Sequence, residues 1–483
     1  MRVLLINPSS WVADTSWVFK TLLSPLPPQG IAYIAAVLEK DGVGVSLIDQ
    51  YAVGLSNERL VSIIDRGAYD LVGFSCLTPT MGNVTAISGG IRKLKKEVKV
   101  VLGNIHATVF AEELLEEGIA DIVVRGEGEY TMRQLTSVLK NHRDLSTVEG
   151  ISFRQNGKVI RNTDREPIRN LDELPYPAWH LLDLRYYKEV ALASLYETAF
   201  PMQASRGCPY RCIFCAQEKI HSLPRYRKIE TVVDELEHMH KRFRVRTFGF
   251  NDAYFPFSFE HGMGFCEEVI ARGLHKVIKW GTELRVDQAN RALLKKMKEA
   301  GVHIIMYGFE SGNQDVLNRA KKKARIEQAY EAMRLTKEAG ILSLGFFILG
   351  LPGETKKTCQ ETIAFAKKLD CDFVKFNIAI PYPGSEFYEM HKDKLKEKLK
   401  EPEKFTSWYD WSTYKPDLVY IPEGMTAQEL IRMQRKAMFE FYVRPRIIIR
   451  HIIRRSISLR NFILGAYILV TRFLRNYLSP DKE

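Results

Sequence analysis

The chain has 483 residues, more than a single hydrophobic core usually covers, so two or three domains are expected. Its hydrophobic fraction of 46% and charged fraction of 27% are ordinary for a globular protein and exclude a disordered or fibrous chain. The net charge of +12 is concentrated near the C-terminus, because residues 431–483 hold twelve Lys or Arg against three Asp or Glu. A charge confined to one segment does not indicate nucleic-acid binding, so no nucleic-acid partner is expected.

The seven cysteines indicate a reducing compartment. Their number is odd, and Cys76, Cys266, Cys359 and Cys371 are scattered without paired spacing, unlike a disulfide framework. The N-terminal apolar run is too short for a signal peptide and is typical of a first strand. The protein is therefore expected in the cytoplasm.

Residues 1–140 alternate short apolar runs with helical patterns, as in a parallel sheet covered on both faces. The predicted strands are 3–7, 45–49, 71–75, 98–103 and 122–125, and the predicted helices are 30–40, 58–66, 82–96, 111–117 and 130–139. This rhythm predicts a flavodoxin-like, doubly wound α/β domain. Such sheets bind ligands at the carboxyl ends of their strands, so the loops beginning at Ser75, Gly103 and Arg125 are the places to expect a ligand. These loops are small and polar, and none is a GxGxxG or phosphate-binding loop.

A linker is predicted over residues 141–195, where short strand-like and polar pieces are separated by Gly157, Pro167, Pro175 and Pro177. The segment 171–179 reads LDELPYPAW and is rich in Leu, Tyr and Trp. We expect it to pack against the domains rather than to hang free.

Three cysteines then fall within eight residues, Cys208, Cys212 and Cys215, in the segment SRGCPYRCIFC. Thiolates are soft ligands for iron–sulfur clusters, zinc or copper(I). A [4Fe–4S] cube needs four ligands, so three cysteines leave one iron open to another ligand. Structural zinc is the alternative, but it needs a fourth ligand, and His221 is the only histidine nearby.

Residues 196–385 again alternate strands with helices. The predicted strands are 201–205, 246–251, 279–283, 304–309, 342–349 and 373–380, with helical patterns such as 231–242 and 325–339 between them. Six βα units predict a partial (β/α)6 barrel of the TIM type, whose working residues lie at the C-terminal ends of the strands. The cysteine loop follows the first of these strands.

Residues 386–483 are predicted to be a mixed, helical C-terminal region with a charged helix at 388–399, a helix at 427–442 and a basic tail. The apolar runs of the tail are about nine residues or fewer, well below the ~20 that span a bilayer. A basic helix with large Ile, Leu and Phe residues is typical of a membrane interface. We expect this tail either to contact the inner face of a membrane or to dock its apolar side on the barrel.

The spacing of the three cysteines, with an aromatic residue before the last, resembles the cluster loop of radical S-adenosylmethionine (radical SAM) enzymes. In that family SAM completes the [4Fe–4S] cluster and is cleaved by one electron to a 5′-deoxyadenosyl radical. The resemblance implies that the strand ends contact SAM, through Phe214, Asp252, Arg285, Glu310, Gly345 and Gly350. For each charged residue, an ion pair at the mouth of the barrel is an equal alternative to a SAM contact. For the glycines, the equal alternative is that a backbone turn requires them.

The preceding domain resembles the cobalamin-binding domain of the B12-dependent radical SAM subgroup, which includes anaerobic magnesium-protoporphyrin monomethyl ester cyclase-like proteins and class B methyltransferases. The resemblance rests on residues 103–106 and 125–129, and it implies cobalamin contacts from Ser75, Thr78, Gly103, His106, Gly126 and Glu127. The DxHxxG motif of methionine synthase-type domains is absent, because the loop after the first strand reads NPSS. We therefore expect cobalamin without a histidine ligand, and for His106 the alternative is that it only hydrogen-bonds a loop.

The resemblance implies an enzyme that uses a [4Fe–4S] cluster, SAM and cobalamin, and that methylates a carbon of a small, hydrophobic or lipid-like substrate. A radical SAM cyclase is the alternative, and a non-catalytic iron–sulfur or cobalamin sensor is the alternative from another class. A tRNA methylthiotransferase is disfavoured, because its N-terminal domain would carry further cluster cysteines and this one has only Cys76. A reduced flavodoxin or ferredoxin is the expected electron donor.

Overall fold

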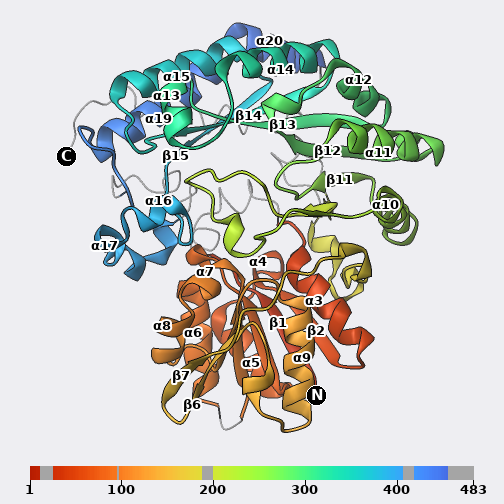
Figure 1. Ribbon diagram of the computed structural model, residues 1–483, viewed down its shortest axis with the longest axis vertical. Coiled ribbons are helices and arrows are strands. Elements are labelled where there is room, and N and C mark those ends of the chain that lie inside the picture. Colours follow the sequence, from red (N-terminus) through yellow and green to blue (C-terminus); the bar gives the residue numbers. More distant parts are fainter. Residues whose placement is uncertain (11–24, 95–96, 188–199, 406–417, 455–483) are drawn as a thin grey trace.

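A computed structural model describes residues 1–10, 25–94, 97–187, 200–405 and 418–454. Figure 1 shows two α/β bodies stacked along the long axis, with the N-terminal body in red and orange and the second body in green and teal. The carboxyl ends of the N-terminal strands face the second body. The ligand-binding edge predicted from the sequence therefore lies between the two bodies.

The N-terminal sheet has seven strands in the order β2-β1-β3-β4-β5-β6-β7. Its first five strands are parallel and close to those predicted: β1 (Arg2–Asn7), β2 (Gly44–Asp49), β3 (Leu71–Ser75), β4 (Lys99–Gly103) and β5 (Ile122–Val124). The order reverses at β1, because β2 lies on one side of it and β3 on the other. This reversal is the switch point at which doubly wound sheets bind ligands.

Helices cover both faces of this sheet because its strands are apolar on both sides. In β1, Val3 and Leu5 join the core under α3 and α9, whereas Leu4 and Ile6 join the core under the helices of the other face. The helices are α3 (Gln29–Lys40), α4 (Gln50–Val53), α5 (Asn57–Arg66), α6 (Met81–Arg92), α7 (Asn104–Val109), α8 (Ala111–Glu116) and α9 (Glu129–Lys140). The short helix α7 occupies a segment that was expected to be a loop.

The expected linker continues the first sheet. Strands β6 (Ile151–Gln155) and β7 (Lys158–Arg161) pair antiparallel with β5 and with each other. Apolar Ile151 and Phe153 are buried in the core, which explains why β6 joins the sheet. The sheet of the first domain thus extends past residue 140.

The second body contains an open, fully parallel six-stranded sheet in the order β15-β14-β13-β12-β11-β8. The strands are β8 (Phe200–Met202), β11 (Thr247–Phe250), β12 (Lys279–Leu284), β13 (Val302–Glu310), β14 (Leu342–Leu349) and β15 (Phe373–Ile378). Its covering helices are α10 (Ile229–Phe243), α11 (Phe259–Ala271), α12 (Arg291–Glu299), α13 (Gln314–Arg319), α14 (Ile326–Glu338) and α15 (Lys356–Leu369). The predicted order of βα units is confirmed.

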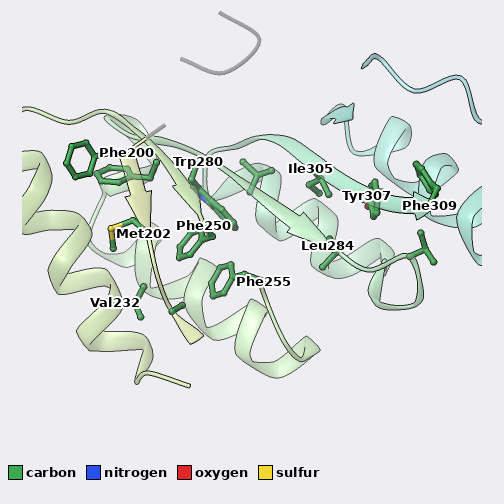
Figure 2. Packing of buried hydrophobic residues seen from close by; sticks show 14 of the residues in the cluster. Phe200, Met202, Val232, Phe250, Phe255, Trp280, Leu284, Ile305, Tyr307 and Phe309 are labelled. Atoms are coloured by element: carbon green, nitrogen blue, oxygen red, sulfur yellow. The ribbon is translucent and has the colours of Figure 1, made fainter. Parts of the chain in front are cut away.

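Aromatic residues fill the layer between this sheet and its helices. Figure 2 shows Phe250, Phe255 and Trp280 turned toward one another, and the ring of Phe250 stacks on that of Phe255 with centroids 4.0 Å apart. The same buried cluster continues into the first domain through Trp179, whose ring meets Phe200 edge-on at 4.7 Å. The aromatic linker therefore packs between the two bodies, as its composition indicated.

The C-terminal region packs partly on the barrel. Helix α19 (Ala427–Tyr442) has the bounds predicted, and it is held to β15 by a hydrogen bond from the Gln434 amide to the Phe376 carbonyl of 3.0 Å. The predicted helix at 388–399 is instead broken into the short α16 (Glu386–Glu389) and α17 (Lys392–Leu395). A segment so rich in charge has too little apolar surface to bury one helix face. The basic tail contains an apolar run at residues 462–470, and the sequence has a cluster of aromatic residues at 405–414; the run and most of the cluster lie outside the described residues.

Candidate functional site

A cavity of about 190 Å³ lies at the carboxyl edge of the first sheet, and the second body forms part of its wall. Of the predicted cobalamin contacts, Ser75, Gly103, Gly126 and Glu127 line it. The second body contributes Gln203, Arg206, Ile220 and His221, which flank the cysteine loop in the sequence. The cavity thus touches both the predicted cobalamin edge and the chain around the three cysteines.

Glycines form much of the wall of this cavity. A Cβ atom on Gly73 would lie 2.9 Å from Leu5, and one on Gly128 would lie 2.8 Å from Ile34. Gly126 adopts φ +68°, a conformation that side chains disfavour. Internal packing therefore excludes a side chain at Gly73 and Gly128, and the backbone turn favours glycine at Gly126, which leaves the backbone of this wall uncovered.

Thr78 and His106 do not line the cavity. The His106 Nδ1 lies 3.0 Å from the Thr78 hydroxyl, and its ring packs on Phe110 at 4.7 Å. Burial lowers the pKa of His106 to about 4, so its imidazole is neutral at pH 7. His106 thus hydrogen-bonds the loop after β3, as the alternative predicts, and a contact of either residue with cobalamin stays a prediction.

The cysteine loop is anchored just before Cys208 and again between its last two cysteines. Before it, β9 (Ser205–Arg206) pairs antiparallel with β10 (Arg225–Tyr226). Within it, the Ile213 N–H donates to the Ala320 carbonyl at 3.1 Å, and the Ile213 carbonyl accepts from the Phe387 N–H at 2.8 Å. These backbone bonds hold the loop over the barrel mouth.

The three cysteines of the loop are accessible and the other four are buried. Cys208 and Cys212 are half-buried and Cys215 is exposed, and all are free thiols. Burial raises the pKa of Cys212 to about 11, and the neighbouring charges of Glu310 and Cys215 act in the same direction. Metals bind the thiolate form of cysteine, so a bound metal would hold these side chains deprotonated.

The donor set fits a [4Fe–4S] cluster. Within the described part of the chain, no three His, Cys, Asp or Glu side chains gather around a point where one metal ion could sit. A cluster differs from a single ion because each thiolate binds a separate iron, so the sulfurs stay apart. Cys208, Cys212 and Cys215 would hold three irons.

Glu310 and Lys322 form a buried ion pair next to this loop. Their charged atoms lie 2.7 Å apart, and both side chains are nearly inaccessible. Glu310 adopts φ +64° at the end of β13, an unfavourable backbone conformation that a structure keeps where the site requires it. Gly308 makes room for the pair, because a Cβ there would lie 2.5 Å from the Glu310 carboxylate.

Lys322 was not singled out in the sequence. It stands among several lysines, so only its burial distinguishes it from them. Burial raises the pKa of the Cys212 and Cys215 thiols, and the charge of the Lys322 ammonium, which pairs with Glu310, acts to lower it. Lys322 therefore brings positive charge to the cluster loop, where anionic thiolates or a carboxylate would gather.

Arg285 also reaches the cluster loop. Its guanidinium carbon lies 3.4 Å from the centroid of the Tyr210 ring, a cation–π contact. It pairs with Asp287 at 3.0 Å and donates to the Lys323 carbonyl at 3.1 Å. The predicted SAM residues Glu310 and Arg285 are thus brought together beside the cysteines, although each already has a partner in the chain.

Asp252 supports the start of the loop. Its buried carboxylate accepts from the Ala204 N–H at 3.1 Å and from the Ser205 hydroxyl. Burial raises the pKa of Asp252 to about 7, while these hydrogen bonds oppose the rise. Its direct contact with SAM stays a prediction.

Gly345, Gly350 and Phe214 lie in packed surroundings. A Cβ on Gly345 would lie 2.9 Å from the Phe347 ring, and Gly350 adopts φ +88° with Leu430 2.8 Å from its Cβ position. Phe214 is half-buried against the small core that includes Ile213. Packing and turn geometry account for both glycines, and their approach to adenine stays a prediction.

Comparison with known proteins gives two family matches, "B12 binding domain" at residues 16–136 and "Radical SAM superfamily" at residues 202–366. An uncharacterized methyltransferase of Pyrococcus horikoshii is 31% identical, over 94% of this chain and 95% of that protein. An anaerobic magnesium-protoporphyrin IX monomethyl ester cyclase of Rubrivivax gelatinosus is also 31% identical, over 82% and 71%. The methyltransferase TsrM from Kitasatospora setae, solved with cobalamin and a [4Fe-4S] cluster, has the same fold with a TM-score of 0.66 and 19% identity, covering 81% of this chain and 78% of that one.

The fold and the site define a two-domain protein that combines cobalamin binding with radical SAM chemistry. The chain belongs to the family of radical SAM enzymes that carry an N-terminal B12-binding domain. Its cofactors are those of the two domains, cobalamin and a [4Fe–4S] cluster with SAM. The predictions of the family, the fold class and the cofactors are confirmed.

Proposed function

We propose that this protein is a cobalamin-dependent radical SAM methyltransferase that uses Cys208, Cys212 and Cys215 as cluster ligands. The observation that carries the proposal is the cavity at the edge of the first sheet, because residues flanking the cysteine loop form part of its wall. A methyl carrier in that cavity and a SAM-binding cluster would face one another across a short distance. Methyltransferases among the relatives support the same assignment.

The cofactors supply the reactive groups, a transferable methyl group from cobalamin and a 5′-deoxyadenosyl radical from SAM at the reduced cluster. The chain positions them. Lys322 and Arg285 bring positive charge toward the cluster, and Glu310 is an acceptor for an ammonium group such as that of SAM. The glycine wall of the cavity lets a broad ligand lie against the backbone.

Substitution of a cluster cysteine tests the enzyme assignment. Anaerobically reconstituted protein should bind about four irons per chain, and cleave SAM to 5′-deoxyadenosine when reduced. Cys212→Ala should lose the cluster absorption and SAM cleavage. Cys266→Ala, a buried thiol outside the loop, should keep both, and intact SAM cleavage in Cys212→Ala would refute the assignment.

A cyclase is the second candidate, because one relative with 31% identity is a cyclase. The products distinguish the two reactions. A methyltransferase consumes a second SAM to remethylate cobalamin and releases S-adenosylhomocysteine, whereas a cyclase need release only 5′-deoxyadenosine. Turnover of a substrate with 5′-deoxyadenosine but without S-adenosylhomocysteine would establish the cyclase.

We propose that the substrate is small and hydrophobic or lipid-like. The proposed electron donor is a reduced flavodoxin or ferredoxin. The proposed place of action is the cytoplasm, at the inner face of the membrane. Helix α20 (Pro445–Arg454) supports membrane contact, because Ile449, Ile452 and Ile453 are 54%, 61% and 75% exposed on a basic segment. No helix in the described residues is long and apolar enough to cross a bilayer. Contact would therefore involve the interface alone.

Flotation with liposomes tests the membrane proposal. The full chain should float with vesicles containing anionic lipid, and less with neutral vesicles or at high salt. A variant with Ile449, Ile452 and Ile453 changed to Ser should float several-fold less. Wild-type protein that stays at the bottom of the gradient with anionic vesicles would refute the proposal.

A further inference from the structure

A buried carboxylate joins three segments of the chain at the wall of the cavity. Glu127, from the loop after β5, receives a bidentate pair from Arg225 of β10, with Nη2–Oε1 2.6 Å and Nη1–Oε2 2.9 Å. The linker joins through Ile168, whose N–H donates to Glu127 at 2.8 Å and whose carbonyl accepts from Arg225 at 2.6 Å. Glu127 thus ties together the first domain, the linker and the strand beside the cluster loop.

The same carboxylate contacts the chain on both sides of the cysteines. The His221 Nδ1 lies 2.9 Å from Glu127 Oε1. Arg206, two residues before Cys208, lies 3.6 Å from Glu127 and donates to Glu129 at 2.6 Å. Every charged side chain of this junction, Glu127, Glu129, Arg206 and Arg225, is at least nine-tenths buried.

The junction connects the cavity to the cysteine loop in a defined order. Glu127, Glu129, Arg206 and His221 line the cavity, whereas Arg225 does not. Arg225 lies behind Glu127 and is the direct strand partner of Arg206 in the β9–β10 pair. A displacement of the cavity wall at Glu127 therefore reaches the chain just before Cys208 by two routes, directly through Arg206 and from behind through Arg225.

Electrostatic attraction keeps the buried Glu127 and Arg225 side chains together. A buried charge that loses its partner costs several kcal/mol, so Glu127 and Arg225 must move together. Burial would raise the pKa of Glu127, but His221, Arg225 and Arg206 hold the pKa far below its usual value. The carboxylate is therefore ionised and keeps its partners at any physiological pH.

We propose that Glu127 and Arg225 are positioning residues that couple cobalamin binding in the cavity to the geometry of the cluster loop. Occupation of the cavity fixes the carboxylate, the carboxylate fixes Arg225, and the paired strands set the direction in which the chain enters the three-cysteine loop. Each cofactor then stabilises the site of the other. The inference needs binding of the two cofactors and no turnover.

Linkage provides the test. If the sites are coupled, hydroxocobalamin must bind more tightly to cluster-loaded protein than to cluster-free protein, and coupling between protein sites is typically 5-fold to 150-fold. Equilibrium dialysis of hydroxocobalamin against both forms gives the ratio of the two Kd values. We expect about fivefold or more for the wild type. The rate at which a chelator removes iron should fall correspondingly when hydroxocobalamin is present.

Arg225→Gln is the decisive variant, because Arg225 touches neither the cavity nor a cysteine ligand. We expect its Kd ratio to fall well below the wild-type ratio, because only the direct contact of Arg206 with Glu127 then remains, and Arg225→Lys to restore part of the coupling because the charge remains. The double variant Glu127→Gln/Arg225→Gln leaves no unpaired charge, so it should fold but should also lack coupling. Glu235→Gln disrupts the nearby buried Arg227–Glu235 pair, which lies wholly in the second body, and should keep the wild-type ratio.

The results separate this inference from the proposed function. A wild-type ratio of one, or a wild-type ratio retained in both Arg225→Gln and the double variant, overturns the coupling and leaves the methyltransferase proposal intact. An equal fall of the Kd ratio in Glu235→Gln also overturns the coupling, because disruption of any buried ion pair would then have the same effect. Failure of the wild type to bind hydroxocobalamin at all overturns both.

Discussion

At the scale of single residues, the space available around the backbone determines which residue the site can accept. Gly207, directly before Cys208, has φ +84°, and a Cβ there would lie 2.3 Å from the Leu223 carbonyl oxygen. The loop can therefore turn toward the barrel only if this residue lacks a side chain. Glycine is therefore a structural requirement of the cysteine loop at this position.

Gly207→Ala should disrupt the cluster loop, because the clashing atoms belong to the backbone and cannot rotate away. Gly157→Ala is the matched control, since Gly157 has φ +78° but no atom within 4 Å of its Cβ position. The control should cost about 1–2 kcal/mol of stability, the usual cost of a left-handed conformation, and keep its iron. Gly207→Ala should retain less than half of the wild-type iron after reconstitution; equal iron in both variants would contradict the prediction.

Lys322→Met should leave the buried Glu310 carboxylate without its ammonium partner. We expect a loss of about 3–5 kcal/mol in the free energy of unfolding of the barrel, measured by urea denaturation. The adjacent Lys321 forms an exposed pair with Glu386, so Lys321→Met should cost about 1 kcal/mol or less. Equal effects of the two substitutions would show that burial of the Lys322 pair is unimportant.

At the scale of elements, helix α20 is attached to the barrel by its basic residues. Arg450 and Arg446 pair with Asp370, and Arg454 pairs with Asp372 at 3.0 Å. Ile447 is buried, but three other isoleucines of the helix face outward. The tail was expected to dock by its apolar side or to lie on a membrane; in its first ten residues it docks largely through charge and leaves apolar surface exposed.

The docking of α20 should weaken in acid. Burial acts to raise the pKa of Asp370, but the hydrogen bond from Arg450 and the charges of Lys337, Arg450 and Arg446 hold it below the usual value near 4. A carboxyl with a lowered folded pKa stabilises the fold above its unfolded pKa and loses this contribution as the pH falls. The wild type should therefore have a higher thermal unfolding midpoint than Asp370→Asn at pH 7. The difference between the two midpoints should disappear as the pH falls below about 4. A gap independent of pH would contradict this assignment.

At the scale of the whole molecule, the two bodies share one hydrophobic core. Trp179 of the linker is 1% exposed, and the N–H of the preceding Ala178 donates to the Ala32 carbonyl of α3 at 2.9 Å. Its ring meets Phe200 of β8 in the second body. The linker therefore packs against both bodies, and Figure 1 shows this part of the chain between them.

Trp179→Ala should uncouple the two bodies. Removal of a buried Trp ring costs about 3–5 kcal/mol, and here the cost falls on the contact between domains. We expect one calorimetric transition for the wild type and two for the variant. Trp280→Ala, which removes a ring buried in the barrel alone, should lower stability without adding a separate transition for the first domain. A single transition in Trp179→Ala would contradict a shared core.

The sequence by itself determined the order of the βα units and the position of the cysteine loop. Both depend on local information, the spacing of apolar residues along each element and the spacing of Cys208, Cys212 and Cys215. Strand ends of a parallel sheet meet at one edge, so Ser75, Gly103 and Gly126 could be placed together before their contacts were known.

Only the tertiary structure decided the roles of the charged residues, because the sequence does not show whether a carboxylate contacts a ligand or pairs with an arginine. Glu127 lines the cavity as expected, but it is also the partner of Arg225, which lies 98 residues further along the chain. Lys322 and Lys321 are neighbours in the sequence, and burial distinguishes the ion pair of Lys322 beside the cysteine loop from the ion pair of Lys321 on the surface. Such roles depend on long-range packing, which sets both the partner and the desolvation of each charge.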